Sequence, residues 1–540
     1  MPPDFHPDTH LALGPWCFSG AEDVYPDWDV LAFADPFPTR EDRCAAGKAV
    51  RALANALLDR LYPEMNRRHG TRRTRAYWHA VLMDWLMHLV MLNWRLWRHV
   101  ELFVETSGGE PLEVAVATAT PPFRFACTED FVNACFAASE LRSWLLSEII
   151  RRRAPAHWQL RAGAQKTPAA LVPRVPIRRA RRAVERIGAR RIWEHLLSGY
   201  VNLLPRRCAR PRAVGASSTN GFPAAFLELM NQLVESSLPE TLRGGFAALE
   251  AEVARHRYRR GRLCVTCINI HDDQANIEIG QAIEAGERVV AVQHGGGYGI
   301  PALLPLLAEL EYGHDAFATW GWSAHEGYEG RLVPLPSPHL SSILGAYRPR
   351  DDRMLLVGAL MSPFNPRCDY YPDPLPYRRR KRYFLSALPP ALRAKLVYRP
   401  YHSADSLADA DYLKRFFPSL VVHEGELHPD MLRARLTVLD HPSTTLCLTM
   451  AADVPTVCFW DAEAWLLGRG SQPLFDGLKQ AGILFDSPQD AARHIAGIWP
   501  RLEEWWAGAE VQKARRAWCR QFALASRLWL LHWMKGLAAL

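Results

Sequence analysis

Short apolar runs alternate with helix-compatible stretches through the second half of the chain. Runs such as the one from Leu436 to Leu439 lack the polar alternation of a half-exposed strand and are typical of strands buried in a parallel sheet. Strands separated by helices in this way predict an α/β fold with two sheet-containing halves. We expect one series of strands at 263–270, 288–294 and 316–322, and a second at 354–357, 395–398, 420–422, 436–439, 456–459 and 483–485.

Helical patterns precede and follow the two series of strands. Residues 41–104, 129–163 and 224–257 predict helices, and the stretch 74–104 carries four tryptophans among leucines. An apolar face this wide indicates a helix buried in the core, with lipid contact as the alternative. A proline-rich linker at 330–350 and a Trp-rich helical tail complete the layout. The predicted domains are residues 1–335, residues 336–500 and a tail of residues 501–540.

Size and composition limit the class of protein. A chain of 540 residues is too long for one ordinary core, so two or more domains are expected. The net charge of +8 favours anionic ligands or a negative membrane surface without requiring nucleic acid. The odd number of 11 cysteines, most of them in apolar runs, indicates free thiols in a reducing compartment. With no apolar run long enough to span a bilayer, we predict a cytoplasmic protein that can touch the inner membrane.

An arginine-rich stretch and a pair of cysteines could each form a binding site, but both have an ordinary structural explanation. Eight arginines fall between Arg174 and Arg191, where a solvated helix face is the usual explanation and phosphate or lipid head-group binding is the alternative. Aromatic residues are not interleaved there, so nucleic acid is not expected as a partner. Cys264 and Cys267 lie in a strand-like run and are interpreted as core residues. No site for a metal ion is predicted.

The first motif that can carry chemistry is a glycine-rich turn directly after the strand that ends near Val292. It comprises Gln293, His294, Gly295, Gly296 and Gly297. Successive glycines let the backbone approach a ligand closely, and such turns expose N–H groups to phosphate or carboxylate. The spacing is neither a P-loop nor GxGxxG. We predict that this loop contacts a ligand and that His294 hydrogen-bonds it or acts as an acid.

A second motif, His271-Asp272-Asp273, follows the strand that begins at Leu263. Either carboxylate could cap the helix predicted from Gln274, which is the structural interpretation. The functional interpretation is a nucleophile or base, with Asp273 preferred over Asp272. A DxD motif is absent here, which disfavours a metal-dependent GT-A enzyme.

Three further features follow strands of the second series. Arg399 can pair with a phosphate or carboxylate through two parallel hydrogen bonds. Asp461 could meet a ribose hydroxyl or only end its strand. The turn after the strand at 436–439 carries an imidazole and three hydroxyls ahead of a helix, an arrangement that suits an anionic phosphate. Its residues are His441, Pro442, Ser443, Thr444 and Thr445.

These motifs occur in an order that resembles a family of transferases encoded with bacterial O-antigen and surface-polysaccharide genes. The motifs are the early Leu13 to Cys17, Tyr77-Trp78, QHGGGYG at 293–299, Thr319 to Trp322, Leu335 to Pro338, Tyr398 to Tyr401, HPSTT at 441–445 and Val454 to Asp461. The family is distantly similar to GT-B retaining β-Kdo transferases. Members usually carry Leu-Glu shortly after HPSTT, whereas this chain has Leu448 in place of the glutamate.

The resemblance implies a GT-B-like fold, with two Rossmann-type domains facing a cleft, added N-terminal helices and a helical tail. It implies that the first domain holds a glycan or lipid-linked acceptor and the second a nucleotide sugar, CMP-activated as in CMP-Kdo, with no other cofactor. His441, Pro442, Ser443 and Thr444 would lie near the CMP phosphate or ribose, and an aspartate in the first half would be the nucleophile. The alternatives are a CDP-polyol-type phosphotransferase of GT-B shape and a non-catalytic binding protein.

Overall fold

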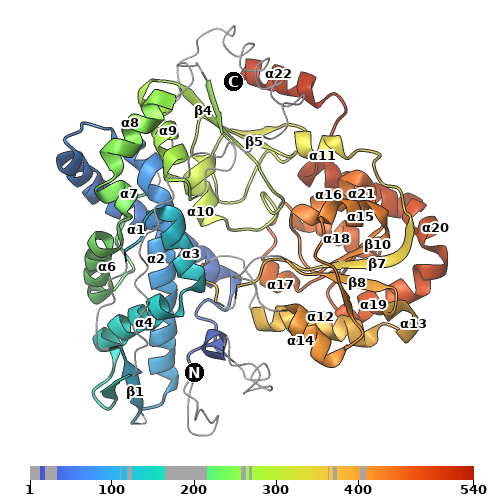
Figure 1. The fold of residues 1–540 in the computed structure, drawn as a ribbon, viewed down its shortest axis with the longest axis horizontal. Coiled ribbons are helices and arrows are strands. Elements are labelled where there is room, and N and C mark those ends of the chain that lie inside the picture. Colours follow the sequence, from blue (N-terminus) through green and yellow to red (C-terminus); the bar gives the residue numbers. More distant parts are fainter. Residues whose placement is uncertain are drawn as a thin grey trace. The chain divides into compact units, whose positions relative to one another are not determined.

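The structure is a computed structural model, and it has the α/β fold with parallel sheets that the sequence predicts (Figure 1). The predicted basic stretch at 174–191 and Cys267 lie outside the residues that it describes. Those residues are 12–18, 33–109, 111–117, 124–163, 216–256, 263–266, 271–362, 364–368, 374–401 and 409–540.

Contacts between residues divide the chain into two compact units. Unit one comprises Met1–Ala291, Pro305–Asp315 and Pro366–Asp369, and unit two comprises Val292–Leu304, Ala316–Asn365 and Tyr370–Leu540. The chain therefore passes between the units several times. The sequence predicted different domains, at 1–335, 336–500 and 501–540. These bounds, and the acceptor and donor roles given to the first two domains, stay a prediction.

Two long helices form the centre of unit one. The first, α1 (Arg40–His69), begins at a capping box between Thr39 and Asp42 and ends at Gly70, whose φ is +64°. The second, α2 (Arg75–Thr106), packs against α1. Its tryptophans at 78, 85 and 97 are completely buried, which confirms the core interpretation of this helix.

Shorter helices surround this pair. The predicted helical stretch 129–163 is α3 (Thr128–Ala137), α4 (Ser139–Arg153) and a strand, β2 (Gln159–Ala162), which pairs in parallel with β1 (Glu113–Val116). The helix predicted from residue 224 is broken at Pro239 and at two glycines, because proline and glycine are poor residues in a helix interior. It forms α6 (Ala224–Ser237), α7 (Glu240–Arg243) and α8 (Phe246–His256).

The first series of predicted strands forms a four-stranded sheet with the order β3-β4-β5-β6. These strands are β3 (Leu263–Thr266), β4 (Arg288–Val292), β5 (Ala316–Thr319) and β6 (Leu332–Pro334). Helix α9 (Asp273–Glu284) connects β3 to β4, and β3 and β4 pair in parallel. Between β4 and β5 lie α10 (Pro305–Leu307) and the π-helical turn η3 (Ala308–Tyr312). The segment predicted as a linker contains β6 and α11 (Pro338–Ser342).

The second series forms a six-stranded parallel sheet in unit two, with the order β12-β11-β10-β7-β8-β9. The strands are β7 (Asp351–Val357), β8 (Leu396–Arg399), β9 (Val421–Val422), β10 (Ala434–Leu439), β11 (Thr456–Phe459) and β12 (Leu484–Phe485). Counted along the chain, this order is 3-2-1-4-5-6, as in the Rossmann fold.

Helices cover both faces of this sheet (Figure 1). On one face lie α12 (Pro374–Ala387), α13 (Pro390–Arg393), α14 (Asp409–Phe416) and α19 (Pro488–Ile498), and their apolar side chains share a core with the strands. On the other lie α15 (Leu427–Arg433), α16 (Thr444–Ala452) and α18 (Gln472–Gln480), with α17 (Ala462–Trp465) near the sheet edge.

The C-terminal helices belong to unit two. They are η4 (Trp499–Arg501), α20 (Leu502–Ala507), α21 (Ala509–Phe522) and α22 (Trp529–Ala539). The backbone N–H of Leu524 donates to the carbonyl of Trp320, and the indole of Trp533 donates to Pro336. The helical tail therefore packs on the segment that follows β5.

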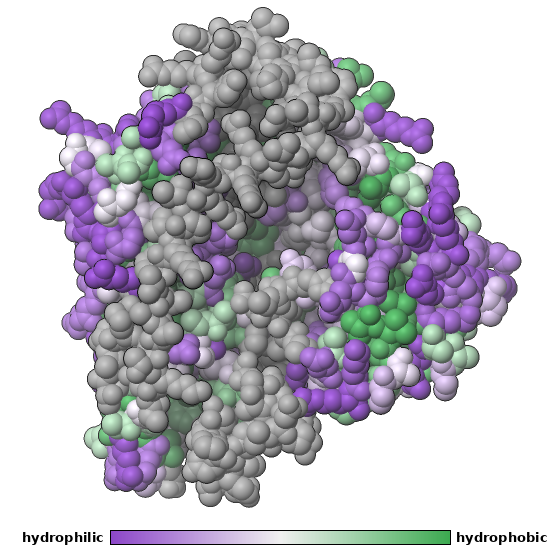
Figure 2. Space-filling view, in the orientation of Figure 1, coloured by the Kyte–Doolittle hydropathy of each residue, from purple (hydrophilic) through white to green (hydrophobic). Residues whose placement is uncertain are grey.

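No helix in the part of the chain that the structure describes is long and apolar enough to cross a membrane. Figure 2 shows that hydrophilic residues dominate the described surface on the face in view, with smaller apolar patches between them.

Candidate functional site

The strand order of the six-stranded sheet changes direction between β10 and β7, at the middle of the sheet. Strands β7 and β10 lie side by side, with Val357 opposite Leu439, yet they are connected to helices on opposite sides. In open α/β sheets such a switch point leaves a crevice beyond the carboxyl ends of the two strands, and ligands bind there. The turn 440–445 continues directly from β10. The predicted phosphate turn therefore lies at the switch point of the sheet.

The start of α16 offers free backbone donors at this turn. Ser443 is the N-cap residue, but its hydroxyl makes no capping hydrogen bond. The N–H groups of Leu446 and Cys447 are satisfied by the Ser443 carbonyl, so the first-turn donors that remain belong to Thr444 and Thr445. Two N–H groups at the positive end of a nine-residue helix suit a phosphate oxygen.

The glycine loop after β4 meets this turn within unit two. The backbone N–H of Gly296 donates to Oγ1 of Thr444 at 2.8 Å, across 148 positions of sequence. A Cβ on Gly296 would lie 2.5 Å from both the carbonyl carbon of Ser443 and the nitrogen of Thr444. Only glycine permits this approach. The structure thus brings together two motifs that the sequence suggested separately, the glycine loop at 293–297 and the hydroxyl-rich turn at 441–445.

Neighbouring residues hold the glycine loop in shape. Gln293 is buried, accepts hydrogen bonds from the Trp320 N–H at 2.8 Å and the Trp322 indole at 2.9 Å, and donates to the Gly295 carbonyl at 2.8 Å. Its polar atoms are therefore used within the protein, and it positions the loop. The backbone of Gly297 has a φ of +89°, which favours glycine.

The ring of His294 stacks edge-on against Tyr298, whose hydroxyl lies 2.9 Å from His294 Nδ1. His294 and the loop that carries it belong to unit two, together with the turn 440–445.

The orientation of His441 is set by a buried carboxylate. Nδ1 of His441 lies 2.7 Å from Oδ1 of Asp440, and the Tyr377 hydroxyl donates to the same oxygen at 2.8 Å. Because the carboxylate accepts, Nδ1 carries the hydrogen and Nε2 is the ring atom that can meet a ligand. His441 is itself buried, as is Pro442 beside it.

The Asp440 carboxylate also belongs to a buried network of charged side chains, with Lys381 and Asp409, that the sequence did not predict. Lys381 Nζ is completely buried and lies 2.7 Å from Asp409 and 3.1 Å from Asp440. Burial alone would raise the pKa of Asp440, but the charge of Lys381 and the hydrogen bond from His441 outweigh burial and hold it below the ordinary value. A lysine in an arginine-rich stretch gave no sign of burial, because only the packing of α12 turns it inward.

Arg399 and Asp461 also follow strands of the six-stranded sheet. Arg399 ends β8 and donates to the Gly425 carbonyl from Nη2 at 3.1 Å, and burial lowers the pKa of its guanidinium. Asp461 follows β11 and is exposed. Both residues belong to unit two, whereas Asp272 and Asp273 belong to unit one.

The two predicted acidic residues have different surroundings. Asp272 caps α9, accepting from the N–H groups of Gln274 and Ala275, as the structural interpretation expects. Asp273 is buried, and its Oδ2 accepts from the Thr128 N–H at 3.0 Å and from the Thr241 hydroxyl. Burial raises the pKa of Asp273, more than these hydrogen bonds lower it. A direct catalytic role would require these contacts to open.

One group of side chains in the described part of the chain has donor atoms close enough to hold a metal ion. It comprises Asp84, His88 and His271 of unit one, whose candidate ligand atoms lie within 4.8 Å of one another. Asp84 and His88 were not predicted as site residues, because they come from a helix that the sequence marked only as core. His271 belongs to the motif 271–273, in which only the two aspartates were chosen.

A sequence model described as that of the LIC12162 family transferases matches residues 1–174 and 206–537. The chain belongs to the LIC12162 transferase family. This confirms the transferase part of the predicted family. No curated protein matches this transferase in sequence.

Among solved structures, this LIC12162 family transferase is similar to OtsA in its apo form, with 11% identity and a TM-score of 0.31 over 56% of this chain and 80% of that one. It is similar to WaaG, a glycosyltransferase involved in lipopolysaccharide biosynthesis, with 13% identity and a TM-score of 0.28 over 53% of this chain and 81% of that one. TM-scores this low do not establish a shared fold, so the α/β assignment stands on the two parallel sheets.

Proposed function

We propose that this transferase is a glycosyltransferase of the GT-B type that binds the phosphate of a nucleotide-sugar donor at the turn 440–445 of unit two. The observation that carries the proposal is the contact between Gly296 and Thr444 at the switch point of a Rossmann-type sheet. It puts a glycine backbone, which can approach a ligand closely, beside a helix start with free N–H groups, a combination suited to phosphate.

The surrounding residues support a nucleotide in this position. The hydroxyl of Ser443 can donate a hydrogen bond to a phosphate or ribose oxygen. Nε2 of His441 can accept one from a ribose hydroxyl, because the hydrogen of this ring is on Nδ1. Arg399 and Asp461 follow other strands of the same sheet and are the candidates for the rest of the donor, including an acidic sugar. Thr444 already accepts from Gly296, so its hydroxyl shapes the loop as well.

We propose a CMP-activated acidic sugar such as CMP-Kdo as the donor and a glycan or lipid-linked glycan of the cell surface as the acceptor, with the reaction on the cytoplasmic side of the inner membrane. Asp273 is the proposed nucleophile or base, on the condition that its contacts with Thr128 and Thr241 open during turnover. His294 would position the donor or aid the leaving group.

The experiment is a titration of the full chain with CMP, CDP, UDP and GDP by calorimetry, in the presence of a chelator. We expect CMP to bind most tightly, and Ser443→Ala to weaken it, because the variant removes a donor at the helix start. Exposed Ser236, whose hydroxyl bonds its own helix, offers a control in Ser236→Ala. Preference for CDP would favour the polyol-phosphate alternative, preference for UDP or GDP would remove the CMP-sugar proposal, and no nucleotide binding would remove the site itself.

A further inference from the structure

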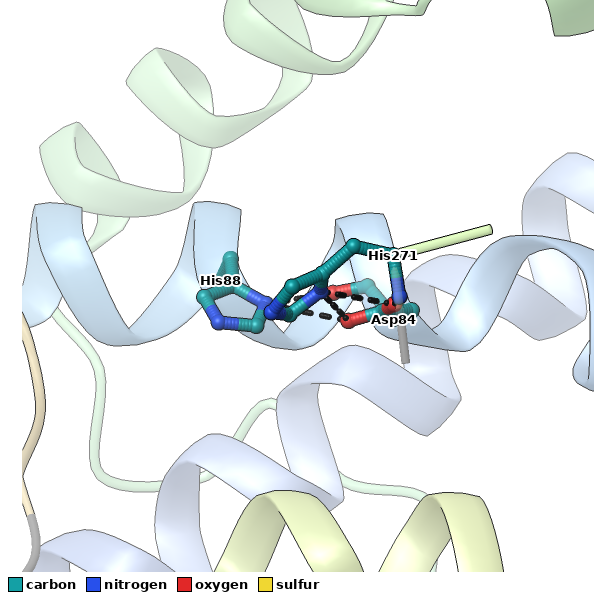
Figure 3. A group of neighbouring side chains, drawn as sticks. All are labelled: Asp84, His88 and His271. Atoms are coloured by element: carbon teal, nitrogen blue, oxygen red, sulfur yellow. Dashed lines mark hydrogen bonds and ion pairs between the residues drawn. The ribbon is translucent and has the colours of Figure 1, made fainter. Parts of the chain in front are cut away.

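A group of three side chains converges inside unit one, whereas the residues assigned to the donor belong to unit two. Asp84 and His88 lie one turn apart on α2, and His271 lies in the loop ahead of α9. Figure 3 shows both imidazole rings turned toward the carboxylate. His271 Nδ1 is 3.1 and 3.0 Å from the two carboxylate oxygens of Asp84, and His88 Nδ1 is 3.2 Å from Oδ1.

These separations suit a bound ion. Zinc-type cations hold imidazole nitrogen and carboxylate oxygen at about 2.0–2.2 Å. Ligand atoms around such an ion are therefore roughly 3–3.5 Å apart, as each nitrogen is from the carboxylate here. The Asp-x-x-x-His spacing on a helix places both side chains on one face. All the candidate ligand atoms lie within 4.8 Å of one another, so the two imidazoles would close from at most that separation around a bound cation.

The backbone of His271 is held in an unusual conformation. Its φ is +70°, in the left-handed region that non-glycine residues seldom adopt. The His271 backbone N–H also donates to Oδ2 of Asp84. Strain of this kind persists where surrounding contacts force it, and it gathers at ligand sites. Here it turns the ring of His271 onto Asp84.

Burial and charge select the kind of ligand. The side chains of Asp84 and His88 are each 1% exposed, whereas that of His271 is 25% exposed, so one side of the group is open to solvent. His88 Nδ1 lies 2.9 Å from the Asp84 carbonyl oxygen and 3.2 Å from the carboxylate, so a bound cation would replace the hydrogen that Nδ1 otherwise donates to these oxygens. Nε2 of His88 is buried and has no hydrogen-bond partner. When both imidazoles bind an ion through a nitrogen lone pair, the Asp84 carboxylate supplies the one negative charge of the group, which a divalent cation would complement.

We propose that Asp84, His88 and His271 bind one divalent transition-metal cation of the zinc class, with its remaining coordination positions on the exposed side of His271. Two nitrogens and one oxygen favour zinc, cobalt or ferrous iron over magnesium or calcium, which prefer all-oxygen sites. The ion would clamp the loop that precedes α9 onto α2. This metal site is independent of the proposed nucleotide site and departs from the expectation that the protein holds no metal.

The test uses the full chain, stripped with a chelator and titrated with Co²⁺, whose visible spectrum reports nitrogen and oxygen ligands. We expect one Co²⁺ per chain, displaced by one Zn²⁺, and at least tenfold weaker binding in Asp84→Asn, His88→Gln and His271→Gln. The matched control is His79→Gln, because His79 Nε2 also faces a buried carboxylate, at 3.2 Å from Glu309, but lies outside the group. The control should bind as the wild type does.

A second kind of variant, which should gain an absorption band, keeps the proposal testable if a variant that lacks a ligand fails to fold. His271→Cys replaces one ligand with a thiolate and should add a near-ultraviolet thiolate-to-cobalt band that the wild type lacks. Absence of a cobalt spectrum in the wild type would overturn the proposal. So would equal binding in the ligand variants and the control, which would assign the metal to cysteines elsewhere.

Discussion

Replacing Gly296 with alanine tests the contact on which the proposed nucleotide site rests. The new Cβ would lie 2.5 Å from the carbonyl carbon of Ser443 and from the nitrogen of Thr444. Ordinary contacts begin at 3.4 Å, so the loop must move away from the turn by the difference, about 0.9 Å. Both of these atoms belong to the backbone at a helix start, so they cannot move aside as the end of a side chain would.

The size of the effect follows from two terms. Moving the loop by that amount stretches the Gly296–Thr444 hydrogen bond from 2.8 Å to well beyond bonding distance, a loss of about 1 kcal/mol. Crowding in a close-packed contact adds about 1–3 kcal/mol, part of which the loop relieves by moving. We expect a net loss of about 2 kcal/mol in nucleotide binding, which is roughly a thirtyfold increase in Kd.

The assay is calorimetric titration of Gly296→Ala with the nucleotide that the wild type binds best, alongside thermal unfolding to check the fold. The control is Gly470→Ala in the same unit, because a Cβ there meets no atom within 4 Å. A Kd for Gly296→Ala within twofold of both the wild type and the control would refute the argument that this contact shapes the site.

Three further variants test other parts of the structure. Thr444→Val removes the acceptor of the Gly296 N–H at constant shape and should lower unfolding free energy by about 1 kcal/mol in urea, whereas an unchanged value would mean that water replaces the bond. Lys381→Met leaves two buried carboxylates without their cation and should destabilise the protein by about 3–5 kcal/mol, while a loss below about 1 kcal/mol would contradict the network. Burial alone would raise the pKa of Glu309 above its ordinary 4.5, but hydrogen bonds from His79 and Arg51 lower it to about 2. This depressed pKa stabilises the fold by about 3 kcal/mol above pH 4.5, and that stability is lost as pH falls toward 2, so Glu309→Gln should flatten the pH dependence of unfolding in this window.

Several elements could be predicted from short windows of sequence. The strands of the six-stranded sheet lie within a few residues of their predicted positions, because continuous apolar runs bounded by turn residues report burial on both faces. The buried character of α2 followed from its wide apolar face in the same way. The break in the helix at Pro239 was not predicted, since a single helix breaker changes the local pattern only weakly. The parallel pair β1–β2 was not predicted either, because its strands are short and polar.

The candidate site was predictable only in pieces. The glycine loop and the turn 440–445 could each be chosen from residue chemistry, and so could Asp272 as a helix cap. The burial of Asp273 and Lys381 could not, because a charged residue next to other charged residues looks solvent-exposed in sequence. Whether it is buried depends on which helix face packs inward.

Short windows of sequence were enough to predict the alternation of strands and helices and to pick out the glycine loop and the hydroxyl-rich turn, because backbone preference and hydrophobic period are local properties. The contact of Gly296 with Thr444, the orientation of His441 by Asp440 beside Lys381, and the grouping of Asp84, His88 and His271 arise from tertiary packing. Such contacts join residues far apart in the chain. They depend on strand order and helix packing, which arise when many weak apolar contacts are satisfied together.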